Sequence, residues 1–225
     1  MDTDVLRRAP LFASLDDEAF SALTEEITEV DLSRGSALFY EGDPGDQLYF
    51  IISGKIKLGR TASDGRENLV AIMGPGEIFG EMALFDPSPR STSATAVSET
   101  RLAGLKHENL RKVITRSPEV SAQLLQALAR RLRRTNENLA DLVFSDVPGR
   151  VAKALLDLAD RFGRPATDGI LVAHELTQEE LAQLVGASRE TVNKALAEFV
   201  QRGWIRLEAR AVVILDLQRL KQRSR

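Results

Sequence analysis

The sequence contains no cysteine, and its 225 residues include only two histidines and three methionines. The absence of cysteine excludes disulfides, thiolate zinc sites and cysteine-ligated iron–sulfur clusters. His107 and His174 lie far apart and do not form the H-E-x-x-H spacing of zinc hydrolases, and neither has an evident partner. We therefore expect no metal, no catalytic residues and no enzyme activity.

Long apolar runs are also missing. No run approaches the roughly 18 residues that a membrane-spanning helix needs. The N-terminus, MDTDVLRRAP, has neither the charge order nor the apolar centre of a signal peptide. We expect a cytoplasmic protein with no membrane partner. Its length and its 43% apolar content suit two domains, each with its own core.

The net charge of −3 conceals an asymmetry along the chain. Residues 1–115 contain 12 lysines and arginines against 19 acidic residues, whereas residues 116–225 contain 18 against 14. A basic second half is typical of a nucleic-acid-binding part joined to a separate part with another task.

The most informative pattern is TQEELAQLVGASRETVNK, at residues 177–194. Leu181, Leu184 and Val185 form an apolar stripe, and Gly186 supplies a turn. Ser188 stands where a helix N-cap belongs. The pattern predicts two short helices that cross at a glycine turn. The plainer alternative is an ordinary helical hairpin with a solvated charged face.

The second of these helices would project four polar residues outward, namely Arg189, Glu190, Asn193 and Lys194. In a major groove an arginine can donate two hydrogen bonds to guanine, and a glutamate can accept one from the cytosine amino group. The spacing therefore favours DNA recognition.

SRETVNK after LAQLVGA resembles the recognition helix of the CRP/FNR family of bacterial transcription regulators, and within that family the actinobacterial cAMP receptor proteins. The resemblance implies that Arg189 and Glu190 read bases. Lys194 stands where many members carry arginine. Three further residues would contact phosphates: Thr177, Gln178 and Ser188.

The first half of the chain changes after residue 30 to short apolar runs separated by glycines, as in EGDPGD. This pattern favours antiparallel strands joined by tight turns, in a barrel or roll. LYFIISGKIKLGR predicts two strands about Ser53 and Gly54, with Ile56 and Leu58 on one face and Lys57 on the other. The family resemblance implies a cyclic-nucleotide-binding β-roll.

The segment FGEMALFDPSPRSTSA, at residues 79–94, is the ligand candidate. Gly80 allows close backbone approach, Glu81 can accept from a sugar hydroxyl, Arg90 can pair with a phosphate, and Ser91 adds a hydroxyl. The segment resembles the phosphate-binding cassette of cyclic-nucleotide domains, and we include Met82 in the expected site. The alternative is a surface loop in which Arg90 and Glu81 pair with each other.

Residues 118–144 contain no internal glycine or proline and carry a heptad seam of five leucines, at positions 125, 128, 132, 139 and 142. Thr135 occupies the seam, and Asn136 follows it. Thr135 can set the register of a two-stranded coiled coil. By the family resemblance, Thr135 and Asn136 instead meet the adenine of cAMP, one from each subunit. RRLRR, at 130–134, is read as a solvated face, some of whose arginines pair with acidic residues of the roll.

FSDVPGR, at 144–150, predicts a hinge, because Asp146 can cap a new helix and Pro148 lies in its first turn. RFGRPATDG is read as loop and ILVAHEL as a strand. WIRLEARAVVILD predicts a two-stranded wing, with Arg206 and Arg210 contacting phosphates.

Together these expectations describe an α+β protein with a roll over 1–115, a dimerisation helix over 116–144 and a winged helix-turn-helix over 145–225. The family resemblance implies a cAMP-responsive homodimer that binds palindromic DNA with TGTGA-like half-sites and acts with RNA polymerase. The alternative is a nucleotide-independent DNA-binding or architectural protein. Thr135 and Asn136 do not distinguish cAMP from cGMP, because they can hydrogen-bond either purine.

Overall fold

The computed structural model describes residues 3–8, 10–13, 15–86 and 88–224, which form two compact units. The first unit comprises residues up to 61 together with 70–134, and the second comprises 135 onward together with 62–69. Three short helices open the first unit: α1 (Thr3–Arg8), α2 (Pro10–Ala13) and α3 (Asp17–Glu25). Asp16 caps α3, because its side chain accepts from the Ala19 amide at 2.7 Å.

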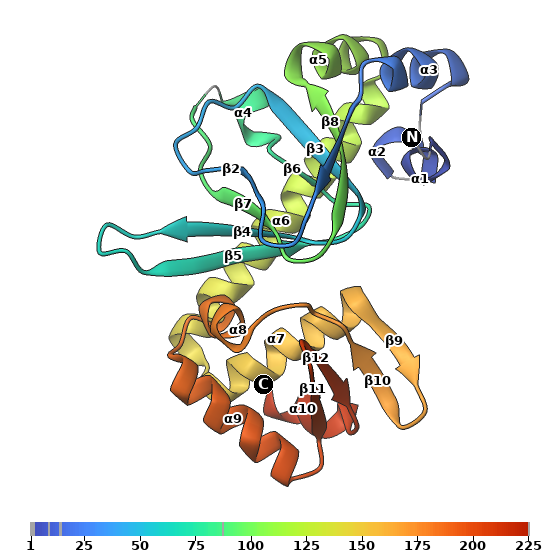
Figure 1. Ribbon diagram of the computed structural model, residues 1–225. Helices are drawn as coiled ribbons and strands as arrows, with labels where there is room; N and C mark the ends of the chain where they lie inside the picture. The colour runs from blue at the N-terminus through green and yellow to red at the C-terminus, as the bar shows by residue number, and fades with distance from the viewer. Residues whose placement is uncertain (1–2, 9, 14, 87, 225) are drawn as a thin grey trace. The chain divides into compact units, whose positions relative to one another are not determined.

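Eight strands of the first half form two four-stranded sheets (Figure 1). The first sheet has the order β1 (Thr28–Leu32), β8 (Thr100–Lys106), β3 (Gln47–Ser53), β6 (Ile78–Phe79). The second has the order β2 (Ala37–Phe39), β7 (Ser93–Ala96), β4 (Ile56–Thr61), β5 (Glu67–Met73). The pairs of β8 with β1 and β3, and of β7 with β2 and β4, are antiparallel, as the spacing of turns predicted.

The two strands expected about Ser53 and Gly54 are present, with Ile56 and Leu58 buried. They enter different sheets rather than pairing with each other. Gly54 makes this possible: its φ is 83°, and a Cβ there would lie 2.2 Å from the Glu99 carbonyl oxygen. Only glycine tolerates both conditions.

The first unit has two apolar cores. One lies among strands of both sheets, and its buried members are Phe39, Ile51, Ile56, Leu58, Met73, Phe79, Ala94, Ala96 and Leu102. The other joins the remaining face of the first sheet to the N-terminal helices, to α5 (His107–Arg116) and to the start of α6 (Pro118–Phe144). The start of α6 is therefore anchored through Val120 and Leu124, both buried in that core.

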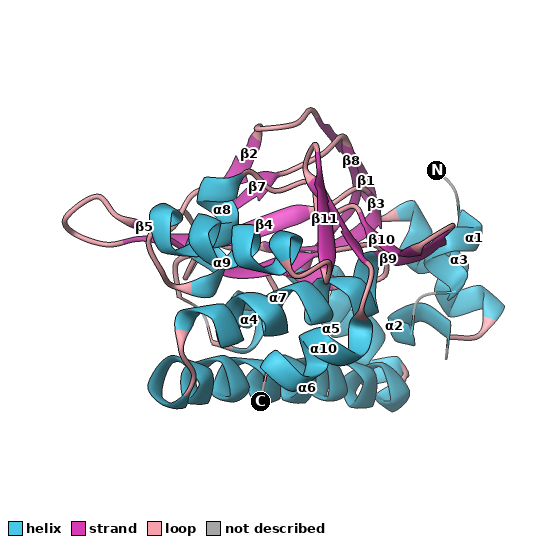
Figure 2. Ribbon diagram, turned by 90° about the horizontal axis from the view of Figure 1, so that it is seen from below, coloured by secondary structure: helices cyan, strands magenta, loops and turns pink. Residues whose placement is uncertain are grey.

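The helix α6 is unbroken over 27 residues (Figure 2). The two compact units divide it between Arg134 and Thr135. Residues 135–144 of the expected dimerisation helix thus group with the C-terminal unit.

The second unit continues through α7 (Val147–Phe162), α8 (Gln178–Val185), α9 (Arg189–Gln201) and α10 (Leu217–Arg223). Its four-stranded sheet has the order β11 (Ile205–Glu208), β12 (Ala211–Ile214), β10 (Gly169–Val172), β9 (Gly163–Ala166). Residues 163–166 are therefore a strand, and the loop prediction was wrong there. β9 is an edge strand, and an edge strand accommodates a proline such as Pro165. The sequence suggested a loop because this proline lies between a glycine and turn residues. No helix among the described residues is long and apolar enough to cross a membrane.

Candidate functional site

Gly80 is the second residue of the candidate ligand segment and directly follows β6. Its φ is 80°, and a Cβ at this position would lie 2.7 Å from Arg90 Nη1 and 3.0 Å from the Gln47 carbonyl oxygen. Both the backbone conformation and the close approach require glycine. Glu81 follows, and the short helix α4 (Met82–Phe85) opens next.

Arg90 reaches back from the end of this segment and is almost fully buried. Its Nη1 donates to the Gly80 carbonyl at 3.1 Å, and its Nη2 donates to the Gln47 carbonyl at 2.8 Å. The guanidinium Cζ lies 4.3 Å from the centroid of the Phe39 ring. Burial lowers the pKa of Arg90, a shift that the nearby Tyr49 and Asp46 oppose. The Arg90 Cζ also lies 5.9 Å from the centroid of the Tyr49 ring, so two backbone acceptors and two aromatic rings fix the guanidinium.

Glu81 has 1% of its surface exposed, and its Oε1 accepts from Arg131 Nη1 at 2.6 Å. Arg131 Nη2 donates to the Ile78 carbonyl at 2.6 Å, so this arginine of α6 lies against the candidate site. Glu81 therefore pairs with Arg131, which overturns the alternative in which Arg90 and Glu81 form a surface ion pair. The expectation that some arginines of the 130–134 cluster pair with acidic residues is confirmed for Arg131 and for Arg134, which lies 3.5 Å from Glu77.

Two buried side-chain atoms of this site have no hydrogen-bond partner among the described residues: Glu81 Oε2 and Arg90 Nε. Buried polar atoms in folded proteins are nearly always paired, so each needs a reason. One atom is an anionic acceptor and the other is a cationic donor. A ligand that carries both a hydroxyl and an anionic oxygen would satisfy the two atoms together, and a sugar phosphate has this chemistry.

Ser91 and Met82 lie at the exposed side of the same segment, where the Ser91 hydroxyl is 3.9 Å from the Met82 sulfur. The structure therefore brings together all five residues that the sequence assigned to this segment. Thr135 and Asn136, assigned to the same ligand, are exposed on α6 and belong to the other compact unit.

Both histidines have backbone partners that the sequence did not reveal. His107 Nε2 lies 3.3 Å from the Gly80 carbonyl oxygen, which Arg90 also binds. His174 is buried, and its Nδ1 accepts from the Leu176 amide at 3.0 Å. Burial, and secondarily the charge of Arg90, lower the pKa of His107, while its contact with Gly80 opposes the shift. Neither histidine has an evident partner in the sequence because these partners are backbone groups, which side-chain patterns do not show.

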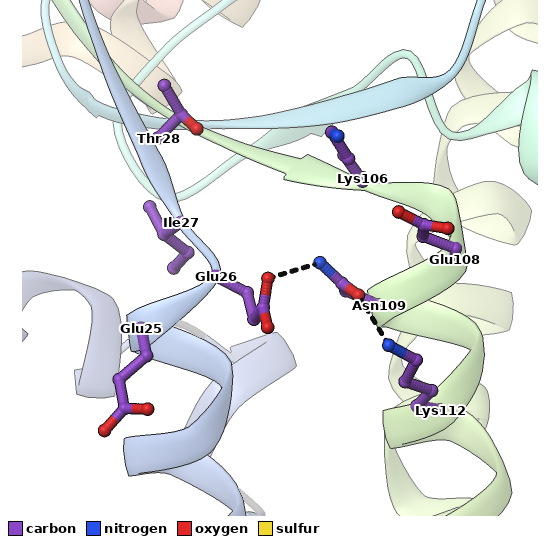
Figure 3. A pocket seen from close by; sticks show the side chains of 8 residues that line it. All are labelled: Glu25, Glu26, Ile27, Thr28, Lys106, Glu108, Asn109 and Lys112. Carbon is purple, nitrogen blue, oxygen red and sulfur yellow. Dashed lines mark hydrogen bonds between the residues drawn. The ribbon is translucent and has the colours of Figure 1, made fainter.

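A separate pocket lies where α3 meets β1 and β8 meets α5 (Figure 3). Asn109 joins its two sides, because its amide donates to Glu26 at 2.9 Å and its oxygen accepts from Lys112 at 3.1 Å. These polar groups satisfy one another. The pocket therefore fits a structural role and not the ligand site.

The helix-turn-helix has the predicted geometry. Gly186 ends α8 in the left-handed conformation at φ 69°, and Ser188 caps α9 by accepting from the Thr191 amide at 3.2 Å. Thr177 caps α8 and forms a capping box with Glu180. Of the predicted apolar stripe of α8, Leu181 and Val185 are buried and Leu184 is half-buried. Ala182 of α8 is also buried, as are Val192, Leu196 and Phe199 of α9.

Arg189, Glu190 and Lys194 are exposed on α9, and Gln178 is exposed at the start of α8. Lys194 Nζ lies 2.7 Å from Glu190 Oε1, one helical turn apart. Asn193 differs from the prediction: it is half-buried, and its Oδ1 is buried without a hydrogen-bond partner among the described residues. Its position follows Val192 directly, at the margin of the buried stripe.

The wing is present as β11 and β12, with Arg210 near its tip at φ 57°. The guanidinium of Arg206 is paired with two carboxylates. It forms a close ion pair with Asp168 and lies 3.4 Å from Glu208. A phosphate contact by Arg206 would therefore have to compete with two carboxylates.

Comparison with known proteins agrees with this architecture. Residues 29–117 match the cyclic nucleotide-binding domain, and residues 149–223 match the Crp-like helix-turn-helix domain. The chain is 58% identical to the CRP-like cAMP-activated global transcriptional regulator of Mycobacterium tuberculosis, over 99% of both chains. It is 37% identical to the cyclic AMP receptor protein of Thermus thermophilus, over 96% of this chain and 97% of that protein.

Among solved structures, the c-di-GMP responsive global regulator CLP of Xanthomonas campestris superposes with a TM-score of 0.76 at 26% identity, over 88% of this chain and 99% of that one. The matched domains and the full-length relatives are those of regulators rather than enzymes. The chain therefore belongs to the CRP/FNR family of transcription regulators.

Proposed function

We propose that the protein is a homodimeric transcription regulator whose affinity for DNA is controlled by cAMP. The observation that carries the ligand half of this proposal is the pair of unpartnered buried atoms, Glu81 Oε2 and Arg90 Nε. Their separate chemistries match a ribose hydroxyl and a cyclic phosphate. The full-length relatives named as cAMP-activated or cyclic AMP receptor proteins support cAMP as the nucleotide.

In this proposal Arg90 and Ser91 hold the phosphate, Gly80 and Glu81 hold the ribose, and Met82 lines the site. When bound, the nucleotide supplies a purine at one end and an anionic phosphate at the other. Arg90 is prepared for the anion because its two carbonyl partners already fix its orientation. Thr135 and Asn136 contact the purine, one from each subunit.

The dimer interface in this proposal is the exposed seam of α6. Leu125, Leu132 and Leu139 are each 63% exposed, and Phe144 at the helix end is 86% exposed. A row of exposed leucines at steps of seven is the pattern that a second identical helix buries in a coiled coil. Residues 1–115, 116–144 and 145–225 then serve as ligand domain, dimerisation helix and DNA-binding domain.

For DNA, Arg189 and Glu190 read bases, with Asn193 and Lys194 beside them, while Thr177, Gln178 and Ser188 contact phosphates. Two recognition helices of a dimer meet successive major grooves about 34 Å apart, so the operator is a palindrome. By analogy with the family, its half-sites resemble TGTGA. The regulator acts in the cytoplasm and contacts RNA polymerase at its promoters.

Calorimetric titration of the dimer with cAMP, cGMP and c-di-GMP, combined with sedimentation analysis, tests this proposal. We expect cAMP to bind at the two cassettes of a dimer and c-di-GMP to bind more weakly. Tighter binding of c-di-GMP than of cAMP would mean that c-di-GMP, and not cAMP, is the ligand. A protein that binds no nucleotide would support the alternative, in which the ligand domain no longer controls DNA binding.

A further inference from the structure

The turn that joins α6 to α7 consists of Ser145 and Asp146 alone. Asp146 caps α7, since its Oδ1 accepts from the Gly149 amide at 2.9 Å. The same carboxylate accepts from Arg223 Nη2 at 2.8 Å and 2.6 Å through its two oxygens. Arg223 is the last residue of α10, so a turn 77 positions earlier in the chain is held by the C-terminal helix.

Packing at this point is tight. A Cβ at Gly149 would lie 3.0 Å from Asp146 Oδ1, 3.3 Å from Arg223 Nη1 and 3.4 Å from the Arg223 carbonyl oxygen. A side chain at position 149 would therefore require Asp146 and Arg223 to move by a few tenths of an ångström. The end of α10 is seated against the first turn of α7, and Leu220 of α10 is fully buried.

A second arginine connects this turn to the reading motif. Arg150 Nη1 donates to the Ser145 carbonyl at 2.8 Å, its Nε to the Val185 carbonyl at 3.1 Å, and its Nη2 to the Gly186 carbonyl at 3.3 Å. Val185 and Gly186 end α8, immediately before the cap of α9. One guanidinium thus binds the end of α6 and the turn of the helix-turn-helix together.

The last turn of α6 makes two further contacts of the same kind. Asp141 lies 2.5 Å from Lys153 of α7, and a Cβ on Gly186 would lie 3.0 Å from Leu142 Cδ2. All these residues belong to the second compact unit, which begins at Thr135. The hinge expected within 144–150 is therefore a turn with side-chain contacts on several sides.

We propose that Arg223 is a positioning residue for allosteric coupling. Its ion pair with Asp146 holds the α6–α7 turn in place, so that a displacement of the end of α6 also displaces the recognition helix α9. This rests on the proposed control by cAMP. If the end of α6 moves as one body with α8 and α9, a displacement of α6 at Thr135 also moves the recognition helix. If the turn were loosely held, α6 could move without moving α9. The shift of the Asp146 pKa below its usual value, caused first by Arg223, agrees with a formed ion pair.

The test compares Arg223→Gln with Lys221→Gln in the full-length protein. Lys221 is an exposed cation on the same helix, so its substitution removes the same charge without touching Asp146. The readout is the ratio of DNA affinities with and without cAMP, measured on one palindromic operator. Typical couplings are about 5- to 150-fold. We expect Arg223→Gln to reduce the ratio at least threefold and Lys221→Gln to leave it unchanged, with cAMP affinity in the absence of DNA preserved in both.

Asp146→Asn provides the reciprocal variant, because asparagine keeps the cap of α7 and loses only the charge. We expect the double variant to behave like either single one. An Arg223→Gln ratio equal to that of the wild type would overturn the proposal. In particular, if Arg223→Gln lowers DNA affinity by the same factor with and without cAMP, Arg223 supports the fold of the DNA-binding unit and not the coupling, which would overturn the proposal.

Hydrogen exchange separates this inference from the proposed function. In Arg223→Gln without nucleotide, amides at 141–150 should exchange faster than in the wild type. Unchanged exchange at these amides would refute the role of Arg223 in holding the turn, whatever cAMP does. If exchange is faster in the variant but cAMP does not change the DNA affinity of the wild type, only the control by cAMP is refuted.

Discussion

At the scale of single residues, Arg90, Glu81 and His107 are ionisable residues of the candidate ligand site that are buried or half-buried, and burial lowers the pKa of Arg90 and of His107. Their types and order were apparent from the sequence. The pairing of the 130–134 arginines with acidic residues of the roll was also expected, but the individual partners were not identified. Arg131 is 50 positions from Glu81, and the acceptor of His107 is a backbone carbonyl. Periodicity reports which face of an element is apolar. It contains no information on contacts between elements far apart in the chain.

Arg90→Lys should weaken cAMP binding at least tenfold. Lysine keeps the charge but loses Nε and cannot reach both the Gly80 and Gln47 carbonyls, and hydrogen bonds to charged groups contribute about 1.5–3 kcal/mol. Calorimetry measures the effect. Arg60→Lys is the matched control, since Arg60 pairs with Glu41 at the surface. Equal affinities of the two variants would remove the phosphate role from Arg90.

His107 should make folding stability sensitive to mild acid. Its folded-state pKa lies below the ordinary value of about 6.5, so the unfolded chain takes up the proton first as pH falls. This contribution to stability is present above pH 6.5 and is lost as pH decreases from there toward the folded pKa. His107→Gln retains a donor for the Gly80 carbonyl without titrating. Denaturant unfolding at pH 7.5 and 5.5 should show a larger loss in the wild type than in this variant; parallel losses would contradict the assignment.

At the scale of elements, local signals predicted well and long-range ones did not. Ser188, Gly186 and Asp146 were identified because caps and left-handed turns depend on a few neighbouring residues. The strand β9 was missed because an edge strand with a proline resembles a loop. Asn193 was placed outward because a helical wheel has no sharp boundary between its buried and exposed faces.

Thr135→Ala tests what α6 does beyond forming a seam. If Thr135 binds the purine, the variant should lose about fivefold in cAMP affinity, the equivalent of one hydrogen bond, with a smaller change in dimerisation. Leu132→Ala should show the opposite ranking, because that leucine is an exposed seam residue. Calorimetry and sedimentation separate the two effects. A larger loss of dimerisation than of cAMP affinity in Thr135→Ala would mean that this residue sets the register of the coiled coil.

Glu190→Ala tests the recognition helix. We expect preference at one base pair of each half-site to relax, with discrimination there reduced by roughly 1–3 kcal/mol. Its loss also frees Lys194, the ion-pair partner in the unbound protein. Glu198→Ala is the control, because Glu198 forms a similar pair with Arg202 further along the same helix. Binding-site selection gives the answer, and a uniform loss of affinity across all sequences would leave Glu190 without a reading role.

At the scale of the whole molecule, the sequence motifs together with the basic second half predicted separate ligand and DNA-reading parts, and the structure has two compact units. The boundary was harder to predict. The structure groups residues 135–144 with the DNA-reading unit, although α6 continues without interruption. Contacts of Asp141, Leu142, Ser145 and Asp146 with α7, α8 and α10 account for this grouping, and none of them was visible in the heptad pattern.

The proposed regulation requires that a nucleotide held by Arg90 and Glu81 changes the affinity of the two α9 helices of the dimer for DNA. The most direct measurement is the affinity of the wild-type dimer for a TGTGA palindrome with and without saturating cAMP, at one fixed salt concentration. We predict that cAMP tightens binding on the order of tenfold, a coupling of about 1.4 kcal/mol. Identical affinities in the two conditions would contradict the claim.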